Sequence, residues 1–376
     1  MEIIIDNEWF YKAISDVNKA ISSKTPFPIL SGIKIIAYND SLVLIGSNSD
    51  IVIEKVVPLT LNGVKVLEVH KPGSVVILAK HLSEIIKKLP AKVHLRVNEK
   101  QVITIQSEEI VTKLFGFNSE QYPKLPQIDE TDYIKIPSTE LIEIIKQTAF
   151  AVSKSESRPA LTGVNMSFKD NRLSFAATDS HRLALRELKL ESNIHGSFIV
   201  PSSSLNELTK LINNDNGEIR IYVTESYMVF KTSFFTLFSR LIEGNYPNIT
   251  GLFPKNFKTT ITLDTAQLLL AIDRACLFAS EWKNNNVQLE ILDAKRIKIS
   301  SHSSNIGGIE EIQNIKEING ETDLTISLDG SYLINALKVI KEEEIRLSFG
   351  GSMRPVLIEP INNPSYNYLI SPVRSY

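Results

Sequence analysis

Apolar residues recur with helical spacing in six segments of the chain and alternate with polar residues between them. The second segment shows the pattern clearly, with Leu82, Ile85, Ile86 and Leu89 on one helical face. Residues 93–97 then alternate as a strand does. The pattern predicts one helix on one face of a small antiparallel sheet, repeated six times, with helices over residues 7–21, 80–89, 138–153, 202–213, 265–280 and 330–341. The predicted N-caps are Ser138, Ser202 and Asp264.

The sequence contains three copies of a longer segment that includes two of these predicted helices. Residues 21–54 align with the segment that begins near Val152, without gaps from Leu30 and Leu161 onward, and a fainter third copy begins near Val287. The copies lie roughly 125–130 residues apart, which is the size of one ordinary domain. We therefore predict an α+β fold of three repeated domains, each with two helices packed on antiparallel sheets, over residues 1–126, 127–252 and 253–376.

Composition narrows the class of protein. No apolar run reaches the roughly 18–20 residues that span a bilayer, and the N-terminus has no signal-peptide pattern, so a folded, cytoplasmic protein is expected. The single cysteine, Cys276, excludes an internal disulfide framework and a cysteine-based zinc site. With 41 basic and 43 acidic residues, the net charge of -2 argues against tight binding of nucleic acid by one large basic surface.

Basic residues recur on the polar faces of the predicted helices. Lys80, Lys87 and Lys88 lie on the second helix, and Lys338 and Lys341 lie on the sixth. A solvated helix face explains each helix taken alone. Their repetition also allows six equivalent helices to direct weak positive charge toward one common object.

Several short motifs resemble one known family. Residues 177–184, with the sequence Ala-Thr-Asp-Ser-His-Arg-Leu-Ala, resemble the signature of the bacterial DNA polymerase III β subunit, the sliding clamp family. Residues 28–30, 158–163, 241–247 and 353–355 and the tail 372–376 resemble other motifs of that family, in order and at matching spacing. The resemblance covers essentially the whole chain.

The resemblance implies a head-to-tail homodimeric ring with six similar domains, helices lining the pore and sheets outside. Such a ring is a processivity factor and not an enzyme, and needs no cofactor and no metal. Its expected partners are duplex DNA, contacted without sequence specificity, the replicative DNA polymerase, the clamp loader and other replication and repair proteins that carry short peptide motifs. Weak attraction suits a protein that must slide on DNA, which agrees with the charge balance.

Two other functions stay open from the residues alone. Asp179, Ser180 and His181 are the residue types of a hydrolytic triad, so a hydrolase of repeated α+β units is one alternative. Neighbouring residues on a strand point to opposite faces, however, and the sequence contains no nucleophile elbow, phosphate loop or zinc-protease motif. The second alternative is a repeat scaffold that binds proteins but never encircles DNA.

The resemblance also implies a peptide-binding pocket between the second and third domains. Aliphatic walls there would accept leucine or phenylalanine anchors, and basic side chains would meet polar groups of the peptide. Core packing is the other interpretation for its leucines. The chain has Ser180 where some family members have glycine, and no basic residue directly after Pro247. The implied pocket residues are Leu161, Thr178, His181, Arg182, Leu183, Pro247, Tyr332, Met353, Leu369, Ile370, Pro372, Val373 and Arg374.

Two further sets of residues follow from the resemblance and the repeat. Lys24 takes the position of a basic residue that touches DNA in the family, and Arg158 lies in the equivalent loop of the second repeat. Both stand beside a proline-containing turn, as exposed loop tips do. Leu277 and Phe278 lie where the family places apolar residues that meet the first domain of the neighbouring chain.

Overall fold

Helices form at all six predicted places in the computed structural model, which describes residues 1–376 except 23–24, 213–216, 250, 255, 280–285 and 374–376. Four of them end well before the residue that the apolar pattern predicts. The six helices are α1 (Asn7–Asn18), α2 (Ala79–Ile86), α3 (Ser138–Thr148), α4 (Ser202–Ile212), α5 (Thr265–Ala279) and α6 (Gly330–Leu337). Short 3₁₀ turns are η1 (Pro28–Ser31), η2 (Ser119–Gln121), η3 (Ala149–Ala151) and η4 (Pro159–Thr162).

Side-chain caps explain where some helices begin. The carboxylate of Asp264 accepts a hydrogen bond from the amide of Gln267 at 2.9 Å, so its predicted capping role in α5 is confirmed. Asp329 caps α6 in the same way through the amide of Ser331 at 2.8 Å. The prediction for Ser138 is wrong, because Ser138 is already helical and its buried hydroxyl has no hydrogen-bonding partner among the described residues.

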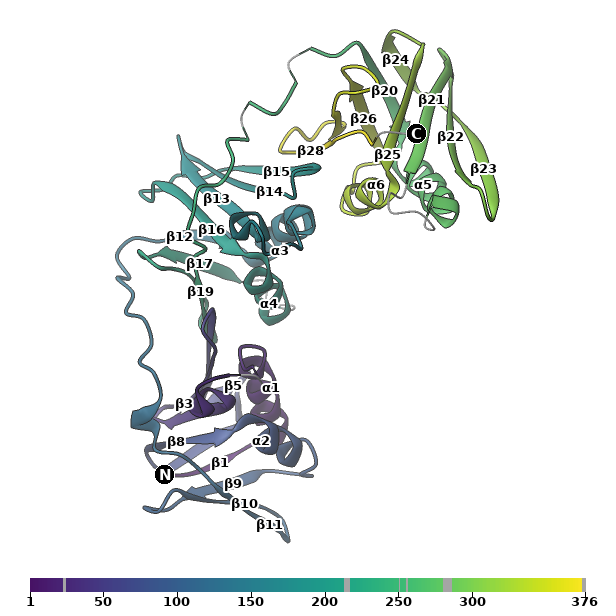
Figure 1. Cartoon of the computed structure of the whole chain (residues 1–376). Coiled ribbons are helices and arrows are strands. Elements are labelled where there is room, and N and C mark those ends of the chain that lie inside the picture. Colours follow the sequence, from purple (N-terminus) through teal and green to yellow (C-terminus); the bar gives the residue numbers. More distant parts are fainter. Residues whose placement is uncertain (23–24, 213–216, 250, 255, 280–285, 374–376) are drawn as a thin grey trace. The chain divides into compact units, whose positions relative to one another are not determined.

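The chain divides into two compact units. Unit 1 comprises Met1–Thr139 and Asn206–Leu241, and unit 2 comprises Glu140–Leu205 and Ile242–Tyr376. Figure 1 identifies the elements of each unit by label and colour. Both α3 and α4 cross the division between the units.

Unit 1 contains two large antiparallel sheets and a short hairpin of β5 (Thr60–Leu61) and β6 (Val64–Lys65). Helix α1 packs against α2, β3 and β4 and buries Phe10, Ile14 and Val17. In spatial order, the five-stranded sheet is β11 (Ile110–Phe115), β10 (Val102–Ser107), β9 (Val93–Val97), β1 (Glu2–Ile5) and β7 (Leu67–Lys71). The eight-stranded sheet is β12 (Ile134–Pro137), β17 (Glu218–Val223), β18 (Tyr227–Lys231), β19 (Phe235–Arg240), β4 (Ile51–Pro58), β3 (Ser41–Ser47), β2 (Gly32–Ala37) and β8 (Gly73–Leu78).

Unit 2 repeats this plan with a nine-stranded and a four-stranded antiparallel sheet. Helix α5 packs against α6 and the four-stranded sheet. In spatial order, the nine-stranded sheet is β16 (Gly196–Pro201), β13 (Gly163–Lys169), β14 (Arg172–Thr178), β15 (Arg182–Lys189), β28 (Tyr366–Ile370), β27 (Val356–Pro360), β26 (Glu344–Phe349), β20 (Thr259–Asp264) and β24 (Glu317–Gly320). The four-stranded sheet is β23 (Gly307–Asn314), β22 (Arg296–Ser303), β21 (Asn286–Asp293) and β25 (Leu324–Asp329).

Sheets merge across consecutive sequence repeats, which the sequence pattern does not predict. Strand β4 of the first repeat pairs with β19 of the second, with Val52 opposite Phe238. Strand β15 of the second repeat pairs with β28 of the third, with Leu183 opposite Leu369. The two joints are equivalent in the repeat, and each one satisfies the hydrogen bonds of two strand edges that would otherwise be unpaired.

Each merged sheet is covered on one face by the chain that connects the repeats. Tyr122 of the first connector is buried against the joint in unit 1, together with Leu125 and Ile128. Tyr246 of the second connector packs against the joint in unit 2, together with Ile249 and Phe253. The candidate site lies at this second joint.

A candidate partner-binding site at the second joint

The joint between β15 and β28 carries an apolar cluster on the face that the connector covers, which we call the connector face. Leu183 and Leu369 lie opposite each other on it, and Ala176 and Leu357 flank them on the neighbouring strands. All four are buried. Paired residues in a sheet share a face, so two predicted pocket residues from distant parts of the sequence meet here.

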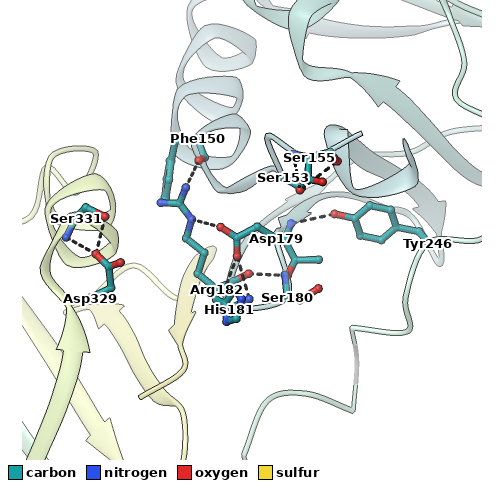
Figure 2. A network of polar contacts seen from close by, with 11 residues as sticks. Phe150, Ser153, Ser155, Asp179, Ser180, His181, Arg182, Tyr246, Asp329 and Ser331 are labelled. Carbon is teal, nitrogen blue, oxygen red and sulfur yellow. Dashed lines mark hydrogen bonds and ion pairs between the residues drawn. The ribbon is translucent and has the colours of Figure 1, made fainter. Parts of the chain in front are cut away.

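The turn between β14 and β15 is held by a dense set of hydrogen bonds (Figure 2). One carboxylate oxygen of Asp179 accepts from the amides of His181 and Arg182, at 2.9 and 3.0 Å. The hydroxyl of Thr178 donates to the carbonyl of Arg182 at 2.6 Å and accepts from the amide of Ser180 at 3.1 Å. These bonds fold residues 178–182 into a tight loop.

Ser180 occupies a backbone conformation that favours glycine. Its φ is 82°, in the left-handed region that side chains with a Cβ atom rarely adopt. The chain therefore departs from the glycine of some family members at a place where glycine would fit without strain. The surrounding hydrogen bonds of Thr178 and Asp179 hold Ser180 in this conformation.

Arg182 is the most constrained basic side chain of the loop. Only 9% of it is exposed, its Nε donates to Asp179 at 3.0 Å, and one terminal nitrogen donates to the carbonyl of Phe150 at 2.8 Å. Its guanidinium lies 4.4 Å from the ring centroid of Tyr332 and 5.4 Å from that of Phe150. Since Arg182 precedes Leu183 on β15, its side chain starts from the face opposite the apolar cluster.

The connector is tied directly to the loop. The hydroxyl of Tyr246 accepts a hydrogen bond from the amide of Thr178 at 3.0 Å, as Figure 2 shows. Burial raises the pKa of Tyr246, so this hydroxyl stays protonated at neutral pH. Pro247, the next residue, is exposed on the connector.

The C-terminal tail is attached to the same loop. The amide of Ser371 donates to the carbonyl of His181 at 2.8 Å, and the amide of Val373 donates to the carbonyl of Ser327 at 2.9 Å. Pro372 and Val373 are half-buried, whereas Arg374 lies outside the described residues. The tail therefore runs from the loop toward β25.

The remaining pocket candidates lie in different surroundings. Leu161 is buried in η4, and its carbonyl accepts a hydrogen bond from the amide of Ser153. Ile370 is buried on the same face as Arg182. His181 is exposed, and so is Met353, which stands 63% exposed between β26 and β27. The structure thus brings together the loop, the connector, the tail and the β15–β28 pair, while the membership of all the candidate residues in one peptide pocket stays a prediction.

The hydrolase alternative finds no support in this geometry. The Asp179 carboxylate binds the Arg182 side chain and backbone amides. Among the described hydrogen bonds, Asp179 contacts His181 through the backbone amide and not through the imidazole ring. Burial raises the pKa of the Cys276 thiol to about 11, so this cysteine is uncharged at neutral pH. Among the described residues, no group of three His, Cys, Asp or Glu side chains could hold a metal ion.

Of the two residues predicted to contact DNA, only Arg158 lies among the described residues. Lys24 lies outside the described residues. Arg158 is exposed just before η4, and one of its terminal nitrogens lies 3.4 Å from the hydroxyl of Ser180. No helix in the described part of the chain is long and apolar enough to cross a membrane.

Exposed apolar residues mark two further surfaces that the sequence pattern missed. Strand β11 is at the edge of its sheet in unit 1, and Phe115 on it is 82% exposed, with Ile110 and Val111 also exposed. Strand β23 is at the edge of its sheet in unit 2 and carries the exposed Ile312. Leu277, on α5 in unit 2, is 68% exposed, while Phe278 is half-buried. Knowledge of which strands are edges would have been needed to find the residues of β11 and β23 from sequence, whereas the resemblance had already pointed to Leu277 and Phe278.

Comparison with known proteins identifies the family. Models of the DNA polymerase III beta subunit match residues 1–126 with its N-terminal domain, 135–248 with its central domain and 250–374 with its C-terminal domain. The "Beta sliding clamp" of Bacillus subtilis (strain 168) is 43% identical, and that of Staphylococcus aureus (strain N315) is 39% identical, each over 100% of both chains.

Solved structures agree with the sequence comparison. The DNA polymerase sliding clamp from Bacillus subtilis has a TM-score of 0.96 at 42% identity, and the beta subunit from DNA polymerase of Streptococcus pyogenes has 0.94 at 32% identity. Both matches cover 100% of both chains. The chain therefore belongs to the DNA polymerase III beta subunit family, the bacterial sliding clamps.

Proposed function

We propose that two copies of this chain close head to tail into a ring that encircles duplex DNA. The observation that carries the proposal is the match of all three consecutive domains to the sliding clamp family. As a sliding clamp, the chain is a processivity factor and not an enzyme. Three similar domains per chain, which we place at residues 1–126, 127–252 and 253–376, would supply the repeated rotation that a closed ring requires.

The exposed sheet edges suggest where the ring closes. An edge strand that carries large exposed apolar residues is a liability unless another strand pairs with it. Strand β11 in unit 1 and strand β23 in unit 2 both fit this description. We infer that β11 of one chain meets β23 and α5 of the next, with Phe115 on one side and Leu277 and Phe278 on the other. Two different surfaces then form each joint, which is a heterologous contact.

Contact with DNA would be weak and independent of sequence. With a net charge of -2, the chain as a whole gives no strong attraction to phosphate. We assign the contact to Lys24 and to the exposed Arg158. Bound DNA would be retained by topology, because the ring surrounds it, and the protein would work in the cytoplasm with the replication machinery.

Partner proteins would dock a short peptide at the second joint. The pocket we propose comprises the loop residues Thr178, His181 and Arg182, the β15–β28 residues, and the connector and tail around them. The replicative polymerase, the clamp loader and other replication and repair proteins would compete for it. Aliphatic and aromatic anchors suit its apolar walls, and one or two anchors usually carry most of the binding energy.

Sedimentation equilibrium tests the ring and its joints. The wild-type protein is expected at twice the chain mass of 42.2 kDa. Phe115→Arg and Leu277→Arg should each give monomers, because either change places an unpaired charge in both joints. Tyr38→Arg, at another exposed aromatic residue of unit 1, is the matched control and should stay dimeric.

Mixing the two variants makes the test specific for a head-to-tail arrangement. In a mixed dimer both substitutions fall in the same joint, so the other joint is wild type on both sides. An equimolar mixture of Phe115→Arg and Leu277→Arg should therefore recover dimer that neither variant forms alone. A monomeric wild-type protein, or no recovery on mixing, would contradict the proposed joint.

A further inference from the structure

A cavity of about 770 Å³ lies on the connector face of unit 2, beside the apolar cluster of the second joint. Its floor is formed by strands β13, β14, β15 and β16, and its wall is formed by the connector residues Tyr246, Ile249 and Phe253. These three connector residues also pack against the apolar cluster. The cavity and the proposed peptide pocket therefore share one wall.

The floor of this cavity is polar, unlike the neighbouring cluster. A row of polar residues crosses the four strands, because each residue lies opposite the next in the sheet register. In spatial order the row is Ser197, Ser167, Ser174 and Glu187. Ser167 and Ser174 are half-buried. In the adjacent row, the side-chain oxygen of Asn165 accepts a hydrogen bond from the Ser197 hydroxyl at 2.7 Å. Hydroxyl and amide groups of this kind can both donate and accept hydrogen bonds.

The charges around the cavity balance. Lys169 and Arg172 line it together with Asp170 and Glu187, and Arg172 lies 3.7 Å from Glu187. A strongly charged ligand would therefore gain little from the cavity as a whole. The groups of the floor favour an uncharged, polar ligand.

A short extended polypeptide can span the distance between the apolar cluster and the polar row of the cavity. Leu183 in the cluster and Glu187 in the polar row lie four residues apart on β15, on the same face, which is about 13 Å at ~3.3 Å per residue. About four residues of an extended chain span this distance. The exposed Pro247, a residue of the proposed peptide pocket, also lines the cavity, so a segment that flanks an anchor bound in that pocket can enter the cavity.

We propose that this cavity binds an uncharged polar segment, rich in Ser, Thr, Asn or Gln, that flanks the docking motif of a partner protein. The inference rests on the peptide pocket of the proposed function and adds a second contact region to it. The anchor supplies binding in the peptide pocket, and the flanking segment supplies selectivity between partners through hydrogen bonds with Ser167, Ser174 and Asn165.

Calorimetry with matched peptides tests this inference. The first peptide carries only leucine and phenylalanine anchors, and two others add six alternating Ser and Asn residues at one end or the other. On wild-type protein, one of the extended peptides should bind about three- to tenfold more tightly than the anchor peptide, the effect of about one net hydrogen bond. The ratio of the two dissociation constants is the quantity to compare, and it should be the same at low and high salt.

Two substitutions in the floor should remove the gain. Ser167→Leu and Ser174→Leu each fill part of the cavity and remove a hydroxyl, so the ratio should fall close to one while the anchor peptide binds as before. Ser226→Leu, at an exposed serine in the turn between β17 and β18, is the matched control and should keep the wild-type ratio.

The outcomes separate this inference from the proposed function. If the anchor peptide binds but neither extension improves its affinity, or if the gain persists in both floor variants, the inference is wrong and the peptide pocket stands. If the anchor peptide itself does not bind the wild-type protein, the peptide pocket is wrong and the inference fails with it.

Discussion

Asp179 organises the loop at the second joint. Its carboxylate binds the Arg182 side chain and two loop amides, and both side chains are largely buried. Removing one partner of a buried ion pair leaves an uncompensated charge, which is far more costly than loss of an exposed pair. Asp179 therefore holds Arg182 in place between Tyr332 and Phe150.

Asp179→Ala should lower the free energy of unfolding by about 3 kcal/mol, the scale for a broken buried pair, and should weaken binding of an anchor peptide. Urea denaturation and calorimetry measure the two effects. Asp293→Ala is the matched control, because Asp293 makes the same kind of pair with Arg296 at 2.7 Å on the surface. Its effect should be much smaller. Equal losses of unfolding free energy in the two variants would show that Asp179 does not have this role.

The Cys276 thiol should be slow to react at neutral pH. Burial, followed by the nearby Asp329 and Asp273, disfavours the thiolate and raises the pKa to about 11. Because the thiolate is the reactive form, the rate of alkylation by iodoacetamide should keep rising up to about pH 11. Mass spectrometry of the single cysteine gives this rate directly. A plateau at the pH of an ordinary exposed thiol would contradict the assigned environment.

The residue types of the loop at the second joint could be recognised from sequence, but the geometry of the loop could not. The residues 178–183 could be singled out from sequence, and the structure places residues 178–182 in one hydrogen-bonded turn and Leu183 on β15. The sandwich of Arg182 between Phe150 and Tyr332 could not be predicted, because its partners are 32 and 150 positions away and come together only through tertiary packing. The left-handed conformation of Ser180 likewise depends on bonds within the folded loop.

At the level of elements, the helices followed from the sequence and the strand partners did not. Apolar spacing on one helix face is a local signal, so all six helices were predicted. The pairs β4–β19 and β15–β28 join strands that are about 180 residues apart, and alternation within a strand says nothing about its neighbour. The polar row of the cavity on β13–β16 was hidden for the same reason.

The C-terminal tail should be required for partner binding but not for dimerisation. It is attached to the loop through Ser371 and to β25 through Val373. Deletion of residues 371–376 should abolish binding of an anchor peptide and stimulation of the polymerase, while sedimentation still gives a dimer. Calorimetry on intact and truncated protein measures the first effect. Unchanged affinity for the anchor peptide after truncation would show that the tail is not part of the pocket.

For the whole molecule, repetition in the sequence was the most informative signal. Three related copies predicted the number of domains, and the matches to three family domains give the chain its place among the sliding clamps. Closure of a ring is harder to predict from one chain, because it depends on surfaces that only a second copy covers. The exposed Phe115 and Leu277 on separate units are the residues through which we expect that closure.

Retention on circular DNA tests the central claim most directly. The protein is loaded with a clamp loader onto nicked circular duplex, half of the sample is linearised with a restriction enzyme, and both halves are passed through a gel-filtration column at high salt. A ring held by topology should stay with the circle and be lost from the linear molecule, whatever the DNA sequence. Equal retention on both forms, or release from both, would contradict a ring that encircles DNA.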